Sequence, residues 1–312
     1  MIVTILTILP VFLIIAAGYA LARTGILGEG APQALNRFVI WLALPCLMFD
    51  IVATTDWARL WHPGFVAVSL IGTFAVYALG LVIGRMRGLS LQDMVVDGLN
   101  ASYANTAYIG LPLLTLVLGP AARPFVAIGA TLTLMALFMT AVLMMELGRS
   151  HGHGIGHALR RALVGVARNP ILVGSILGLV WWLSGLHLPV PAKTFVSLLG
   201  GAASPTALVA IGVFLAGRPL RESAANQSVA MLSVTKLVLH PAITAIFAWH
   251  VFALPPFIAT CAIAIAAMPT GTGPFMIAEF YARDGRVTSG AILVTTLLSV
   301  LTIAGVISLL PH

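Results

Sequence analysis

Charged residues are scarce in this sequence. Asp, Glu, Lys and Arg make up 8% of its 312 residues, whereas soluble domains contain about 25%, and 60% of the residues are hydrophobic. A surface this poor in charge excludes an ordinary soluble enzyme. The formal net charge of +7 would suggest a nucleic-acid partner in a soluble protein, but here the basic residues lie in short loops between apolar runs. The composition therefore predicts a polytopic membrane protein with no nucleic-acid partner.

Cysteine is almost absent. Cys46 and Cys261 both fall inside apolar segments, so we expect buried packing residues rather than a disulfide or a metal site. A cleavable signal peptide is not expected either, because residues 1–22 lack a basic start and a cleavage site. We interpret that stretch as a retained first membrane span.

Long apolar runs dominate what remains, and each is about as long as a membrane-spanning helix. They predict an all-α membrane protein with ten transmembrane helices. The predicted spans are residues 2–22, 33–54, 64–84, 94–118, 123–147, 170–187, 194–217, 227–253, 256–282 and 287–310.

The basic residues test this count of spans. Twelve of the 16 Lys and Arg residues lie in or beside the odd-numbered loops, three lie in the even-numbered loops, and Lys236 lies inside a span. Because basic loops stay in the cytoplasm, the odd loops are predicted to be cytoplasmic. Both termini should then face outward, in a multi-pass protein of the cell (inner) membrane.

The longest loop, residues 148–169, divides the chain into a first five-helix unit (1–147) and a second (170–312). It contains His151, His153 and His157. Since no acidic residue or cysteine lies nearby, we interpret it as a polar cytoplasmic linker, with a metal-binding tract as the alternative.

The two units show signs of an internal repeat. At an offset of 160 residues, four prolines and glycines of the first unit coincide with residues of the same type in the second. The pairs are Pro10 with Pro170, Gly18 with Gly178, Gly25 with Gly185, and Pro45 with Pro205. An odd number of spans in each copy makes the second copy inverted, which is a common transporter architecture.

Two spans carry helix-breaking residues at corresponding places. The fourth contains NASYANTAYIGLP (100–112), and the ninth contains PTGTGP (269–274). Interruptions in hydrocarbon leave backbone groups unpaired unless they line a site, and paired broken helices are typical of transporter binding sites. We therefore predict that the breaks of helices 4 and 9 converge near the middle of the membrane.

The helix ends that start at these breaks would carry unpaired N–H groups and partial positive charge, which favours an anion such as a carboxylate. Side chains at the breaks could add hydrogen bonds. The predicted substrate-binding residues are Asn105, Thr106, Gly110, Pro112, Pro269, Thr270, Gly271 and Thr272. Amides following Pro112 and Pro269 are expected to bind the carboxylate. The alternative is a packing kink without a ligand.

Three further polar residues inside spans are candidates for a coupling or charge-partner role. Lys236 and His240 lie one turn apart on the same face of the eighth span, and Asp50 lies near the outer end of the second. Lys236 would neutralise the substrate or pair with an acid, unless it reaches the membrane surface. No metal or cofactor is predicted, but coupling to H⁺ or Na⁺ is open.

The motifs NTAYIGLP (105–112), KLVLHP (236–241) and PTGTGPFMIAEFY (269–281) resemble the auxin efflux carrier family, which includes plant PIN proteins and bacterial malate and malonate permeases. The resemblance implies a fold like that of bile acid:sodium symporters. Helices 1, 2, 6 and 7 would form a scaffold, and helices 3–5 and 8–10 a mobile transport domain in which the broken helices 4 and 9 cross at their breaks. The protein would be a homodimer in membrane lipid. Gly271 and Gly273 stand where many members have an asparagine, which leaves Asn105 as the one amide at the crossover.

These patterns predict a secondary active transporter of a small organic anion, a mono- or dicarboxylate, and the family resemblance implies that it works by an elevator-like alternating-access mechanism. The alternatives are a Na⁺- or H⁺-coupled symporter or antiporter with a cation at the crossover, and a ligand-binding membrane sensor. We do not expect an enzyme, because the sequence has no HExxH motif and no paired aspartates.

Overall fold

Helices make up nearly all of the computed structural model, which describes residues 2–28, 30–54, 62–149, 170–217 and 226–309 together with Gly156 and Val164. The predicted linker, including His151, His153 and His157, therefore lies almost wholly outside the described residues. Within them, the backbone forms an isolated bridge between Ala104 and Thr270 but no strand.

Six helices of the described part of the chain are long and apolar enough to cross a membrane. They are Ala31–Thr54, Pro63–Met86, Pro120–Met145, Val190–Ala216, Gln227–Val251 and Arg286–Leu309. Four shorter apolar helices correspond to the other predicted spans: Phe12–Arg23, Thr106–Leu118, Val173–Leu183 and Pro256–Ala266. The protein is thus an all-helical membrane protein.

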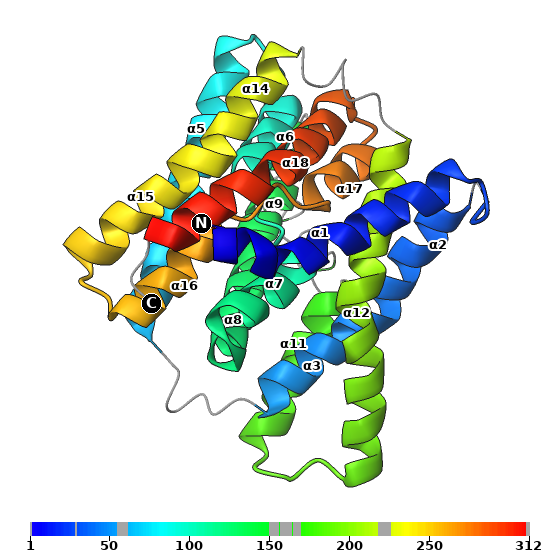
Figure 1. Cartoon of the computed structure of the whole chain (residues 1–312). Coiled ribbons are helices and arrows are strands. Elements are labelled where there is room, and N and C mark those ends of the chain that lie inside the picture. The colour runs from blue at the N-terminus through cyan, green and yellow to red at the C-terminus, as the bar shows by residue number, and fades with distance from the viewer. Residues whose placement is uncertain are drawn as a thin grey trace.

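Two groups of helices are distinguished by their packing (Figure 1). In the first, α1 (Ile2–Arg23) packs along α12 (Val190–Ala216), and α3 (Leu44–Thr54) packs along α11 (Pro170–Leu183) and α12. The short α2 (Ala31–Phe38) and the π-helical turn η1 (Val39–Ala43) lead into α3. This group lies on the right of Figure 1.

The second group surrounds the two interrupted helices. Here α5 (Pro63–Met86) packs along α6 (Leu91–Ser102), and α15 (His240–Ile246) packs against both α5 and α16 (Pro256–Ala266). Its remaining elements are η2 (Thr106–Gly110), α7 (Leu111–Leu118), η3 (Pro120–Ala122), α8 (Arg123–Leu132), η4 (Thr133–Phe138), α9 (Met139–Arg149), α14 (Gln227–Val234), η5 (Thr235–Leu239), η6 (Phe247–Val251), α17 (Gly273–Phe280) and α18 (Arg286–Leu309).

Glycines allow the first group to pack backbone against backbone. A Cβ atom on Gly18 of α1 would lie 2.3 Å from the carbonyl oxygen of Val209 in α12. A Cβ atom on Gly178 of α11 would lie 2.8 Å from the carbonyl oxygen of Phe49 in α3. Small residues at such contacts are the usual means of close helix packing in membranes. Gly18 and Gly178 are 160 residues apart in the chain, and so are their respective partners, Val209 and Phe49. The two contacts therefore correspond at the offset of the predicted repeat.

Helix ends repeat at the same offset. α1 ends at Arg23 and α11 ends at Leu183. Two residues after each end comes a glycine in the left-handed region, Gly25 with φ of 73° and Gly185 with φ of 67°. Glycine adopts this conformation without steric cost, which explains its place in both helix-terminating turns.

A polar cluster ties the loop after α17 to the start of α6. The Arg283 guanidinium donates from Nε to Asp93 Oδ1 at 2.7 Å and from Nη1 to Gln92 Oε1 at 3.3 Å, and it also pairs with Asp93 Oδ2. Ser90, the N-cap of α6, donates to the same carboxylate at 2.6 Å. These bonds fasten the second broken helix to the first at one end.

This cluster should make stability depend on pH. The hydrogen bond from Arg283 holds the pKa of Asp93 below its usual value, so the contribution is complete above about pH 4 and is lost as pH falls through the lowered value. Since both side chains are partly exposed, we expect a small effect. The unfolding midpoint of the wild type should exceed that of Asp93→Asn at pH 6, and the difference should shrink by pH 3. A constant difference would contradict this role.

Candidate functional site

The first broken helix is interrupted by three residues. α6 ends at Ser102, Tyr103–Asn105 are not helical, and helix resumes at Thr106 as the π-helical turn η2 followed by α7. The Asn105 carbonyl accepts from the N–H groups of both Ile109 (3.2 Å) and Gly110 (2.9 Å), which makes Asn105 the N-cap of the second half-helix.

This geometry corrects one prediction. The helix that follows the break begins at Thr106, not after Pro112, and both Gly110 and Pro112 lie inside it. Proline needs no N–H in the first turns of a helix, and the wider π-helical turn precedes it here, so Pro112 does not interrupt the helix. The amides nearest the break therefore belong to the first turn from Thr106 onward.

The second broken helix pairs with the first through backbone atoms. α16 ends at Ala266 and α17 begins at Gly273. The Asn105 N–H donates to the Pro269 carbonyl at 2.8 Å, and the Gly271 N–H donates to the Tyr103 carbonyl at 3.0 Å. These bonds flank the bridge between Ala104 and Thr270. The two predicted breaks thus meet as one crossover.

Thr270 stabilises the crossover through hydrogen bonds of its hydroxyl and its backbone N–H. Its hydroxyl donates to the Asn100 carbonyl at 2.9 Å, and its N–H donates to Thr295 Oγ1 at 3.1 Å. Its side chain is fully buried. The Asn100 amide in turn donates to Thr288 Oγ1 at 3.0 Å. Among the predicted site residues, Thr270 and Pro269 therefore supply crossover bonds and do not line the adjacent cavity.

A cavity of about 60 Å³ lies beside the crossover. It is lined by four predicted site residues, Asn105, Thr106, Gly271 and Thr272, together with Ile40, Tyr103, Ala104, Ala107, Tyr108, Ala130, Thr133, Phe138 and Gly273. Asn105 is only 4% exposed, and its amide nitrogen Nδ2 has no hydrogen-bond partner within the described structure. A buried amide donor without a partner costs about 1–3 kcal/mol, so this side chain is suited to a ligand that accepts a hydrogen bond.

Tyr103 explains the glycines of the second break. A Cβ atom on Gly271 would lie 2.9 Å from its ring, and one on Gly273 would lie 2.5 Å from its Cζ atom. The ring of Tyr103 therefore lies against the backbone of the second break and forms one wall of the cavity. Sequence reasoning missed this residue, although the two glycines spaced two residues apart were a signal that something packs closely there.

Lys236 lies in η5 and is fully buried. It is roughly 14 Å along its helix from Gln227, too deep to reach the surface. Its Nζ atom lies 2.6 Å from the Ala266 carbonyl oxygen and 3.1 Å from His240 Nδ1. The predicted neighbours Lys236 and His240 are thus in contact, and both reach toward the end of α16.

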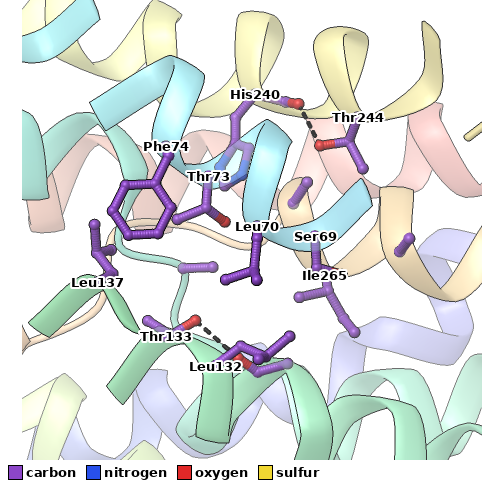
Figure 2. A pocket seen from close by; sticks show the side chains of 14 residues that line it. Ser69, Leu70, Thr73, Phe74, Leu132, Thr133, Leu137, His240, Thr244 and Ile265 are labelled. Carbon is purple, nitrogen blue, oxygen red and sulfur yellow. Dashed lines mark hydrogen bonds between the residues drawn. The ribbon is translucent and has the colours of Figure 1, made fainter. Parts of the chain in front are cut away.

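A second, smaller cavity of about 20 Å³ adjoins His240, large enough for about one water molecule. Figure 2 shows the His240 ring beside Thr73, with Thr133 approaching from the opposite side. Ala104 and Thr133 line both this cavity and the larger one. Thr133 lies in the fifth predicted span, for which no interruption like those of the fourth and ninth was predicted, so the sequence offered no signal for it.

The remaining candidate for a coupling role, Asp50, lies apart from the crossover. Asp50 is half-buried in α3 and lines neither cavity. Its carboxylate interacts electrostatically with Arg123 and Lys193. Asp97 is buried and pairs with Arg87. In the part of the chain that the structure describes, no cluster of His, Cys, Asp and Glu could hold a metal ion.

Comparison with known proteins gives the family. The family described as "Membrane transport protein" matches residues 3–153 and 155–307. A Rhizobium meliloti protein named "Putative malonate transporter" is 32% identical over 310 residues, covering 97% of this chain and 94% of that protein. An uncharacterized transporter of Methanothermobacter thermautotrophicus is 26% identical, covering 95% of both chains. Auxin efflux carrier component 8 of Arabidopsis thaliana is 21% identical, covering 94% of this chain and 93% of the carrier. This chain, with its crossed and interrupted helices, therefore belongs to the auxin efflux carrier family of membrane transport proteins.

Proposed function

We propose that the protein is a secondary transporter of a small organic anion and that the anion's carboxylate binds in the 60 Å³ cavity at the crossover. The observation that carries this proposal is the buried Asn105 amide, which lines the cavity with an unused donor. A carboxylate accepts such a bond strongly, because bonds to a charged acceptor are about twice as strong as neutral ones.

The surroundings of Asn105 favour negative charge. Helices begin at Thr106 and at Gly273, and both residues line the cavity. Each start carries unpaired N–H groups and partial positive charge. The hydroxyls of Thr106 and Thr272 are further donors, and none of the described lining residues is acidic. Together these groups support an anion rather than a cation as the ligand.

The size of the cavity supports a compact substrate. At about 10–15 Å³ for each water-sized group, 60 Å³ accommodates a handful of such groups. The aromatic rings of Tyr103, Tyr108 and Phe138 wall it, which disfavours bulky anions. A short mono- or dicarboxylate such as malonate fits these limits, and the name of the Rhizobium meliloti relative refers to malonate transport.

Transport would follow alternating access in an elevator-like movement. The helices α1, α3, α11 and α12 would form the static scaffold, and the group around the crossover would move. Tyr108 beside the crossover donates to Asn36 Oδ1 of α2 at 3.4 Å, a bond long enough to exchange easily. An inverted repeat of ten spans is supported by the contacts and helix ends that recur at an offset of 160 residues.

The same proposal includes orientation and assembly. The bias of basic residues toward the odd loops supports cytoplasmic odd loops and outward-facing termini in the cell membrane. The family resemblance supports a homodimer. Both are open to test by labelling of terminal tags and by mass measurement in detergent.

Uptake of labelled malonate into proteoliposomes tests the function. The wild type should show saturable uptake, and Asn105→Ala should lower it at least tenfold, because among the described residues that line the cavity only Asn105 has a side-chain amide. Thr24→Ala, which removes an exposed hydroxyl distant in sequence from the crossover, is the matched control and should transport as the wild type does. The site assignment fails if Asn105→Ala transports normally, and the substrate assignment fails if the wild type shows no saturable uptake.

A further inference from the structure

The break in the second helix leaves a carbonyl without its helical partner. In a continuous helix, the Ala266 carbonyl would accept from the N–H of Thr270. That N–H instead donates to Thr295 Oγ1 at 3.1 Å. Ala266 ends α16, so its oxygen also carries part of the negative charge of the helix end. Unpaired carbonyls at such interrupted helices are where transporters coordinate Na⁺.

Lys236 occupies this position. Its Nζ atom lies 2.6 Å from the Ala266 oxygen, within the length of a strong charge-assisted bond. Among the described residues, no carboxylate lies within ion-pair distance of it. The charge of Lys236 is therefore matched by a helix end, not by an acid. Of the two roles predicted for Lys236, pairing with an acid is not observed among the described residues, and neutralisation of the substrate stays a prediction.

His240 is arranged to accept from the same ammonium. Lysine has three donors and no acceptor, so His240 Nδ1 must accept at 3.1 Å. The ring is then neutral with its proton on Nε2. A second positive charge is thereby kept away from Lys236, and the ammonium has two acceptors in a fully buried place.

We propose that Lys236 is a tethered cation: its ammonium fills a monovalent-cation site formed by the Ala266 carbonyl and His240 Nδ1, and its charge supports anion binding at the crossover without a free ion. The inference rests on the proposed function for its second part only. The ammonium contacts Ala266 and His240, which line the smaller cavity, and Ala104 and Thr133 line both that cavity and the substrate cavity. A merely structural lysine would fill the space but would not need its charge.

The test separates charge from shape. Lys236→Met keeps most of the side-chain volume without the charge, and its malonate uptake should fall at least tenfold. Lys236→Ala lacks the atoms that correspond to propylammonium, so millimolar propylammonium should raise both its unfolding midpoint and its uptake saturably, whereas 1-propanol should not. Lys193→Met, at an exposed lysine, is the control and should respond to neither solute.

The results that would overturn the proposal are distinct. Wild-type uptake by Lys236→Met, an equal effect of propanol and propylammonium, or no effect of either on Lys236→Ala would each reject it. Should both variants fail to fold, the wild type decides: replacing Na⁺ by choline should leave its unfolding midpoint and uptake unchanged, and a Na⁺ requirement would reject the tethered cation. If the wild type does not take up malonate, the proposed function fails, but the unfolding measurements on Lys236→Ala still test the cation site.

Discussion

Asn105→Asp is expected to abolish anion uptake while leaving the protein folded. The change replaces the donor that faces the cavity by a carboxylate, and two negative charges about 4 Å apart repel each other by about 4 kcal/mol at an effective dielectric constant of 20. That corresponds to a roughly thousand-fold loss of affinity. Folding should survive because the side chain of residue 105 makes no capping bond that could be lost, and it lies at a helix start, where the partial positive charge favours a carboxylate.

Two measurements check this expectation together. Malonate binding by isothermal titration should disappear in Asn105→Asp, and the unfolding midpoint in detergent should match or exceed that of the wild type. Asn105→Ala separates the two effects, because it removes the donor without adding charge and should lose less affinity. Retained malonate binding in a folded Asn105→Asp would place the anion somewhere other than this cavity.

Gly212→Ala, a substitution in α12, is expected to cause the largest loss of folding stability. Its Cβ atom would lie 2.0 Å from the Ile15 carbonyl oxygen and 2.7 Å from the Tyr19 nitrogen. These are backbone atoms of α1, which cannot rotate away as a side chain can. The helices α1 and α12 must move apart along their contact, and overpacking of this kind costs about 1–3 kcal/mol or more of folding free energy. We therefore expect a fall of several degrees in the unfolding midpoint.

Gly201 in the same helix provides the matched control. A Cβ atom there would have no neighbour within 4 Å. Because alanine is a better helix former than glycine by about 1 kcal/mol, Gly201→Ala should be neutral or stabilising. Opposite signs for two identical substitutions in one helix would show that contact with α1, not helix propensity, controls the effect. Equal midpoints for both variants would contradict the packing argument.

The sequence predicted the broken helices because helix-breaking residues are visible in apolar runs. It could not place the first break correctly, because Pro112 and Gly110 fit inside a helix that starts at Thr106. What decides the position is the pairing of Asn105 with Pro269, a contact between residues far apart in the chain. Backbone pairing of this kind leaves no mark on the side-chain pattern.

The candidate site was predictable in part for the same reason. Asn105, Thr106, Gly271 and Thr272 line the cavity because they flank the breaks. Thr133 does so only because its helix packs behind the crossover, which depends on the tertiary structure. For Lys236, depth in the membrane was readable from the sequence, but its partner, a carbonyl 30 residues away, was not.

The crossover is joined by main-chain hydrogen bonds, with Asn105 bonded to Pro269 and Gly271 bonded to Tyr103. If one broken helix slid along the other, four backbone groups would lose their partners where no water can replace them, at several kcal/mol for each group. The two broken helices would therefore have to move together as one rigid body. In the proposed transport cycle, the movements that open and close the anion site would then take place where this unit contacts the surrounding helices. The free energy of anion binding would be transmitted through those contacts.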